Sequence, residues 1–139
     1  PVPVNPRVSS KDMMIIALAG PVSNLLLIPV FFAVAFGLGH TLGPDMSPLA
    51  HAIYRMAGAG IMWNVVLAAF NLLPVPPLDG SKILYHFLPF SLRQKMMQLG
   101  RYSIILFALI LFTPVKMVIF VPIAIVLMIF NAMLPLDIW

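Results

Sequence analysis

The chain has 139 residues, of which 62% are hydrophobic and only 9% are charged. A soluble globular domain carries about 25% charged residues, so this composition excludes a soluble domain, a disordered tail and a nucleic-acid-binding domain. It indicates an integral membrane protein in contact with the lipid bilayer. The net charge of +4 comes from basic residues that flank apolar runs, which is typical of contact with lipid headgroups and not with nucleic acid.

The first elements are an extended segment and a long apolar run. Residues 1–6 carry a proline at every second or third position, so we expect them to be extended. The run at 13–38 is 26 residues long and exceeds the ~20 residues that span a bilayer. Gly20 and Pro21 predict a kink or a helix restart within it. The glycines around His40 predict a loop at its end.

Three further crossings are expected after this loop. Residues 56–73 are just long enough to span, and the prolines at 74–77 end that helix. Ser91 is expected to cap a short interfacial helix at 92–99. The last apolar stretch is broken at 113–116, which predicts crossings at about 97–112 and 117–134. The sequence therefore predicts a single all-α membrane domain over 1–139, with about four transmembrane helices interrupted by proline and glycine.

The basic residues predict how these crossings are oriented. With four crossings, both ends of the chain and the 80–101 loop lie on one side of the membrane. That side carries six basic residues and the other side carries two. The positive-inside rule then predicts a cell-membrane protein with its two ends and the 80–101 loop in the cytoplasm. The six are Arg7, Lys11, Lys82, Arg93, Lys95 and Arg101, and the two are Arg55 and Lys116.

One stretch, NLLPVPPLDG at 71–80, combines residues that could carry chemistry. Asn71 ends the second crossing, the prolines stiffen an extended break, and Asp79 follows with Gly80 behind it. An ionisable residue near the membrane is costly, so it is usually paired or faces a cavity or a metal. A carboxylate held in this way is a suitable ligand for zinc. Proline, aspartate and glycine are also the residues of ordinary turns, which leaves a purely structural interpretation open.

This stretch resembles the second signature, Asn-x-x-Pro-x-x-x-x-Asp-Gly, of the site-2 protease family of intramembrane zinc metalloproteases. AGPVSN at 19–24 is similar to the Gly-Pro-x-x-Asn segment of that family. PVPVNP at 1–6 is similar to the stretch that follows the first catalytic helix in its short prokaryotic members. The three motifs come in the family's order, and the resemblance covers nearly the whole chain.

The resemblance implies a reaction and a set of site residues. The reaction is hydrolysis of a peptide bond in a transmembrane protein substrate by water bound to one zinc ion. Asp79 corresponds to the third zinc ligand of the family. Asn71 corresponds to the signature asparagine, which we expect to donate to the oxyanion or to hold the substrate strand. Asn24 and Gly80 are expected to support the site.

The chain departs from the family in lacking the HExxH motif. It contains no glutamate at all, and His40, His51 and His86 are not spaced four residues apart as a two-histidine helix site requires. We expect the HExxH segment to lie before Pro1 in a longer protein, of which this chain is the C-terminal part. As it stands, the chain is expected to bind zinc poorly and to be inactive.

Two other functions remain open from the sequence. One is a non-catalytic membrane scaffold, a pseudoprotease relative that binds a partner helix without zinc. The other is a small transporter or channel subunit that uses Asp79 as an ion site. The second is disfavoured because the apolar runs offer no further acid or base to pair with Asp79. The sequence upstream of Pro1 would separate protease from scaffold, because only the protease needs HExxH.

Overall fold

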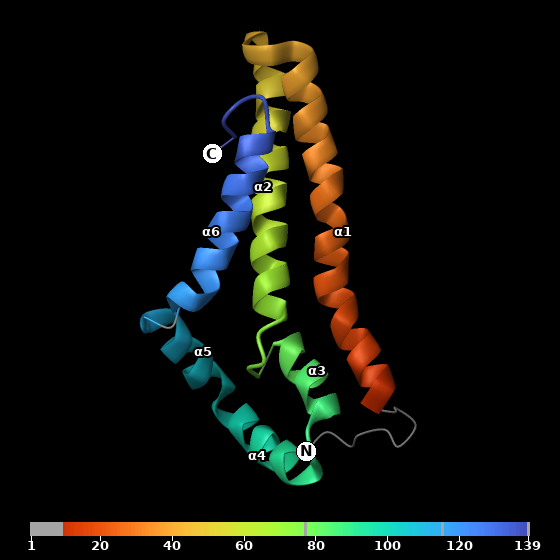
Figure 1. Cartoon of the computed structure of the whole chain (residues 1–139), viewed down its shortest axis with the longest axis vertical. Helices are drawn as coiled ribbons and strands as arrows, with labels where there is room; N and C mark the ends of the chain where they lie inside the picture. Colours follow the sequence, from red (N-terminus) through yellow and green to blue (C-terminus); the bar gives the residue numbers. More distant parts are fainter. Residues whose placement is uncertain (1–9, 77, 115, 139) are drawn as a thin grey trace.

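The computed structural model of the chain describes residues 10–76, 78–114 and 116–138 (Figure 1). Over these ranges every regular element is helical, and no strand is present. The segment 1–6, predicted to be extended, lies outside the described residues. The all-α class predicted from the sequence is confirmed.

The described chain forms two long helices followed by four shorter ones. Helices α1 and α2 run antiparallel and side by side, and the α3–α6 segment turns back along them (Figure 1). The elements in chain order are α1 (Ser10–Leu42), η1 (Gly43–Asp45), α2 (Pro48–Asn71), α3 (Asp79–Phe87), α4 (Phe90–Leu99), η2 (Gly100–Tyr102), α5 (Ser103–Phe112) and α6 (Lys116–Met133).

Four stretches of the described chain are long and apolar enough to cross a membrane: Lys11–Asp45, Pro48–Asn71, Phe90–Phe112 and Lys116–Met133. This agrees with the predicted number of crossings, and the chain is a multi-pass membrane protein. The third stretch runs through α4, η2 and α5 without a long break. The helix predicted at 92–99 is therefore part of a candidate span, and its interfacial position stays a prediction.

Helix α1 corrects two predictions. It continues through Pro21 and Pro29, so of the two alternatives predicted at Gly20 and Pro21 the helix restart was wrong, and the kink stays a prediction. It also continues to Leu42, so His40 lies in its last turn and not in a loop. In an apolar solvent a broken helix leaves backbone groups without hydrogen bonds, which costs more than the ~1 kcal/mol of a glycine in a helix. The Ser23 hydroxyl also donates to the Gly20 carbonyl, 2.8 Å away, beside the proline.

Two helix starts differ from prediction, and one helix was not predicted. Helix α2 begins at Pro48 and not at residue 56, since the Ser47 side chain accepts the Ala50 N–H and proline suits the first helical position. Helix α4 begins after Pro89, so the prediction that Ser91 caps it was wrong. Helix α3 was not predicted. Arg93 closes the turn between α3 and α4 by donating to the carbonyls of Leu88 and His86.

The main interface of the described chain lies between α1 and α2. Ile28 of α1 packs with Ile61 and Val65 of α2, and Ile123 of α6 joins this cluster. Gly60 is required for the close approach, because a Cβ placed there would lie 2.6 Å from the ring of Phe31. The two long helices therefore form a closely packed frame that positions the other elements.

The segment after α6 folds back onto this frame at the end where η1 joins α1 and α2 (Figure 1). The buried Tyr54 hydroxyl donates to the Leu136 carbonyl. The Asn131 amide donates to Asp137 Oδ1 at 3.1 Å, and its oxygen accepts the Ile138 N–H at 3.2 Å. The Tyr54 bond fastens the segment after α6 to α2, and the two Asn131 bonds hold that segment to the end of α6.

The glycine contacts predict a difference between two alanine variants. Gly60→Ala forces the Phe31 ring to move, so it should lower the free energy of unfolding by about 1–3 kcal/mol. Gly37→Ala is the matched control, since a Cβ there meets nothing within 4 Å and alanine favours the helix. Thermal unfolding of both variants in detergent measures the difference. Equal midpoints would contradict the close α1–α2 packing.

Candidate functional site

The candidate site lies where α2 ends and α3 begins. After Asn71 the chain passes through hydrogen-bonded turns, in which the Leu73 N–H donates to the Phe70 carbonyl (3.0 Å) and the Leu78 N–H to the Val75 carbonyl (2.9 Å). Leu78, directly before α3, is extended, with φ −73° and ψ 155°. The predicted extended break therefore contains hydrogen-bonded turns, and Asp79 follows it in the first turn of α3.

Gly80 sets how closely α3 approaches the end of α2. A Cβ placed on Gly80 would lie 2.3 Å from the Leu72 carbonyl oxygen and 2.4 Å from that of Leu73. These are backbone atoms, which cannot swing aside as a side chain can. Only glycine allows α3 to start directly against the preceding turn, so Gly80 determines where the Asp79 carboxylate lies.

Helix α1 meets this turn at Gly20. A Cβ placed on Gly20 would lie 3.1 Å from Asp79 Oδ2 and 3.8 Å from Asn71 Nδ2. The structure therefore brings together residues from both sequence motifs, the Gly-Pro-x-x-Asn segment and the Asp-Gly signature. Asn24 is half-buried one turn further along α1 and shares a helix face with Gly20.

The Asp79 carboxylate has an ion-pair partner that the sequence reasoning missed. Lys82 Nζ donates to Asp79 Oδ1 at 2.7 Å, and the two side chains are 53% and 29% exposed, respectively. The i,i+3 spacing on a helix was the signal that could have found this pair. A partly exposed pair of this kind contributes at most ~1 kcal/mol to stability. Its main consequence is the orientation that it gives to the carboxylate.

The three histidines do not form a cluster of metal ligands with Asp79 in the described part of the chain. His40 and His51 lie near the η1 end of the two long helices, opposite to α3 (Figure 1). His86 lies in the last turn of α3, and its Nδ1 is buried without a hydrogen-bond partner among the described residues. No group of three or more His, Asp or Glu side chains in the described ranges could hold a metal ion. The described residues thus fit one ligand position of a zinc site, at Asp79, and not a complete site.

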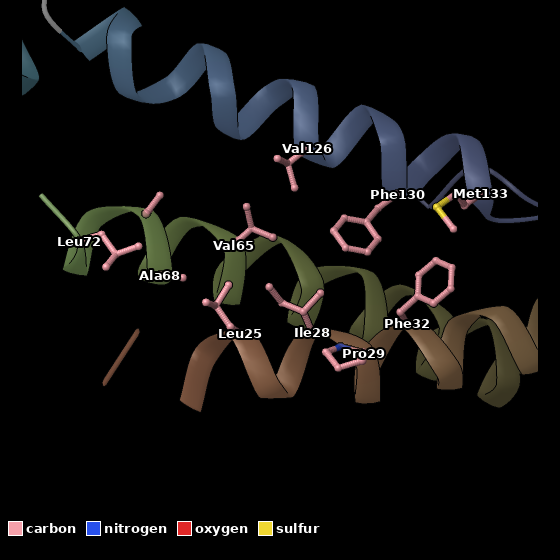
Figure 2. A pocket seen from close by; sticks show the side chains of 11 residues that line it. Leu25, Ile28, Pro29, Phe32, Val65, Ala68, Leu72, Val126, Phe130 and Met133 are labelled. Carbon is pink, nitrogen blue, oxygen red and sulfur yellow. The ribbon is translucent and has the colours of Figure 1, made fainter. Parts of the chain in front are cut away.

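An apolar groove of about 610 Å³ lies between α1, α2 and α6 (Figure 2). Figure 2 shows side chains from all three helices lining it, among them Phe32, Val65 and Phe130. Its lining includes Leu72, the residue after Asn71. The groove offers no polar side chain, so it adds no ligand or proton-transfer group to the site.

The chain is thus an apolar, helical membrane protein. It holds one carboxylate, that of Asp79, at the junction of two helices, where it is a candidate metal ligand. Residues 41–114 match peptidase family M50, a stretch that includes Asn71, Asp79 and Gly80. The chain belongs to this family, the family of the site-2 proteases, as the sequence motifs predicted.

Two relatives carry names that agree with this family. The chain is 37% identical over 118 residues to "Putative zinc metalloprotease YwhC" of Bacillus subtilis (strain 168), covering 82% of this chain and 53% of that protein. It is 38% identical over 69 residues to "Putative zinc metalloprotease MJ0611" of Methanocaldococcus jannaschii, covering 50% of this chain and 31% of that protein. The chain thus spans about half the length of the first relative and less of the second. No solved structure matches it.

The contact at Gly80 predicts a local effect of substitution. Gly80→Ala places a Cβ against two carbonyl groups, so α3 must move away from the end of α2. We expect faster amide hydrogen exchange across Asp79–Phe87, measured by mass spectrometry. Gly100→Ala is the control, because a Cβ there meets nothing within 4 Å. Unchanged exchange in α3 of the Gly80 variant would show that the junction is looser than described.

Proposed function

We propose that this chain is part of an intramembrane zinc metalloprotease and that it supplies the third zinc ligand, Asp79. One observation carries the proposal. In a membrane protein of peptidase family M50, Gly20 lies beside both Asn71 and Asp79, although it is distant from them in the sequence. Two motifs that resemble family signatures therefore share one location.

Zinc sites in enzymes use three protein ligands and keep one position open. The described residues supply one of them, so the two histidines and the glutamate of HExxH would come from polypeptide outside these 139 residues. The chain alone is then expected to bind zinc weakly and to cleave nothing. When bound, zinc would act as a Lewis acid toward water and the scissile carbonyl.

Asn71 has a separate role in this proposal. Its amide nitrogen faces the same point of α1 as the Asp79 carboxylate, since both lie within 4 Å of a Cβ placed on Gly20. A side-chain N–H beside the metal ligand can donate to the oxygen that becomes negative during peptide-bond cleavage, or to the backbone of an extended substrate. Gly80 supports this arrangement through the approach of α3, and Asn24, one turn from Gly20 on α1, is proposed to support it from that helix.

The membrane setting supports a proposal for the substrate and for the orientation. A site at the end of a spanning helix suits the hydrolysis of a transmembrane protein substrate beside or within the bilayer. The α3–η2 region around the site carries Lys82, Arg93, Lys95 and Arg101, which favours the cytoplasmic side by the positive-inside rule. We therefore infer a cell-membrane protease whose site lies toward the cytoplasm.

The ligand role of Asp79 is tested in the complete protein. Asp79→Ala should reduce zinc content and lower cleavage of a transmembrane substrate by more than about 100-fold, since even the loss of an outer-shell partner costs 10–100-fold. Asp45→Ala, which removes an exposed acid at the opposite end of the frame, is the matched control. Zinc is measured by elemental analysis and cleavage by gel electrophoresis.

Two results would contradict the proposal in different ways. Wild-type zinc content and activity in the Asp79 variant would remove Asp79 from the ligand set. A complete protein that encodes no HExxH and cleaves nothing would instead favour a non-catalytic scaffold that binds a partner helix.

A further inference from the structure

The two oxygens of the Asp79 carboxylate have different neighbours. Oδ1 accepts a hydrogen bond from Lys82 Nζ at 2.7 Å. Oδ2 faces α1, where a Cβ on Gly20 would lie 3.1 Å away. We propose that Lys82 is a positioning residue, which holds Oδ1 so that Oδ2 is the oxygen presented to zinc. This inference rests on the proposed function of Asp79.

A carboxylate needs such a contact to be presented in one orientation. The terminal torsion of an aspartate is broad, because rotation about it meets only small barriers. Asp79 and Lys82 are one turn apart on the same face of α3, so their charged groups meet without distorting the helix. A charge-assisted hydrogen bond at 2.7 Å holds the carboxylate more firmly than a neutral one. Lys82 therefore selects one orientation from many.

The Lys82 side chain is 53% exposed, and part of it lies against neighbouring residues. It lines a cavity of about 350 Å³ between α1, α3 and α4, together with Ser81, Tyr85 and Met97. The Tyr85 hydroxyl and Met97 sulfur lie 3.6 Å apart across the α3–α4 contact. The aliphatic part of the Lys82 side chain thus lies beside the residues that line this cavity, while its ammonium group reaches Asp79. On the other side of the carboxylate, Gly20 of α1 limits movement.

The 2.7 Å distance between Lys82 Nζ and Asp79 Oδ1 also fits the opposite effect, in which the ammonium group competes with zinc for Asp79. The two effects differ in sign. The carboxylate has two oxygens, and Lys82 is bonded to Oδ1 alone, so zinc at Oδ2 and lysine at Oδ1 are compatible. Carboxylates that bind metals are commonly held by such an outer-shell partner, whose loss weakens metal binding 10–100-fold. Positioning therefore predicts weaker zinc binding when Lys82 is removed, and competition predicts tighter binding.

The test measures the zinc dissociation constant of the complete protein in detergent by competition with a chelator of known affinity. We expect Lys82→Ala to weaken zinc binding about 10–100-fold. Lys82→Met should do the same while keeping the apolar stem, which guards against a packing defect. Lys82→Arg retains a cationic donor and should stay within about threefold of wild type. Lys95→Ala, an exposed lysine of α4, is the matched control and should leave the constant unchanged.

A double-mutant cycle separates this inference from the proposed function. If Lys82 acts through Asp79, then Lys82→Ala should add no further weakening in an Asp79→Ala background. A wild-type or tighter zinc constant in Lys82→Ala, with weaker binding in Asp79→Ala, would overturn the positioning role alone. Unchanged zinc binding in Asp79→Ala would overturn both. Equal weakening by Lys82→Ala with and without Asp79 would show that the lysine acts elsewhere.

Discussion

The candidate site depends on one constraint: the residues at positions 20 and 80 must be glycines, which have no Cβ. Gly80 lets the first turn of α3 lie against the carbonyl groups at the end of α2, and Gly20 lets α1 approach the Asp79 carboxylate. A methyl group at either position would meet protein atoms at 2.3–3.1 Å. The carboxylate is thus positioned by backbone packing, which is stiffer than a surface loop.

The long frame of α1 and α2 carries two specialised ends. At one end, Tyr54 and Asn131 bind the segment after α6. At the other end, the turn after Asn71 carries Asp79 and its lysine partner. The two helices of the frame pack closely between these ends, for example where Gly60 lies against the ring of Phe31. The family match spans residues 41–114, a range that includes the Asp79 end of the frame.

The predictions that held and those that failed have different physical origins. Spanning helices were predictable because apolar length alone decides whether a segment crosses a bilayer. Their ends were not, since they depend on capping by Ser47, on the Arg93 contacts with the α3–α4 turn, and on the cost of leaving backbone unbonded in an apolar solvent. Helix α3 was not predicted because its nine residues are too few to span a bilayer, although its apolar residues share one face.

By itself, the sequence determined the membrane class, the number of candidate crossings, and the order of motifs that resemble the family signatures, because these depend on local composition and spacing. Only the tertiary structure decided that Gly20 lies beside Asp79 and Asn71, and that the segment after α6 returns to Tyr54. These contacts join residues distant in the chain. Which faces meet is set by the packing of whole helices, and no local pattern encodes that.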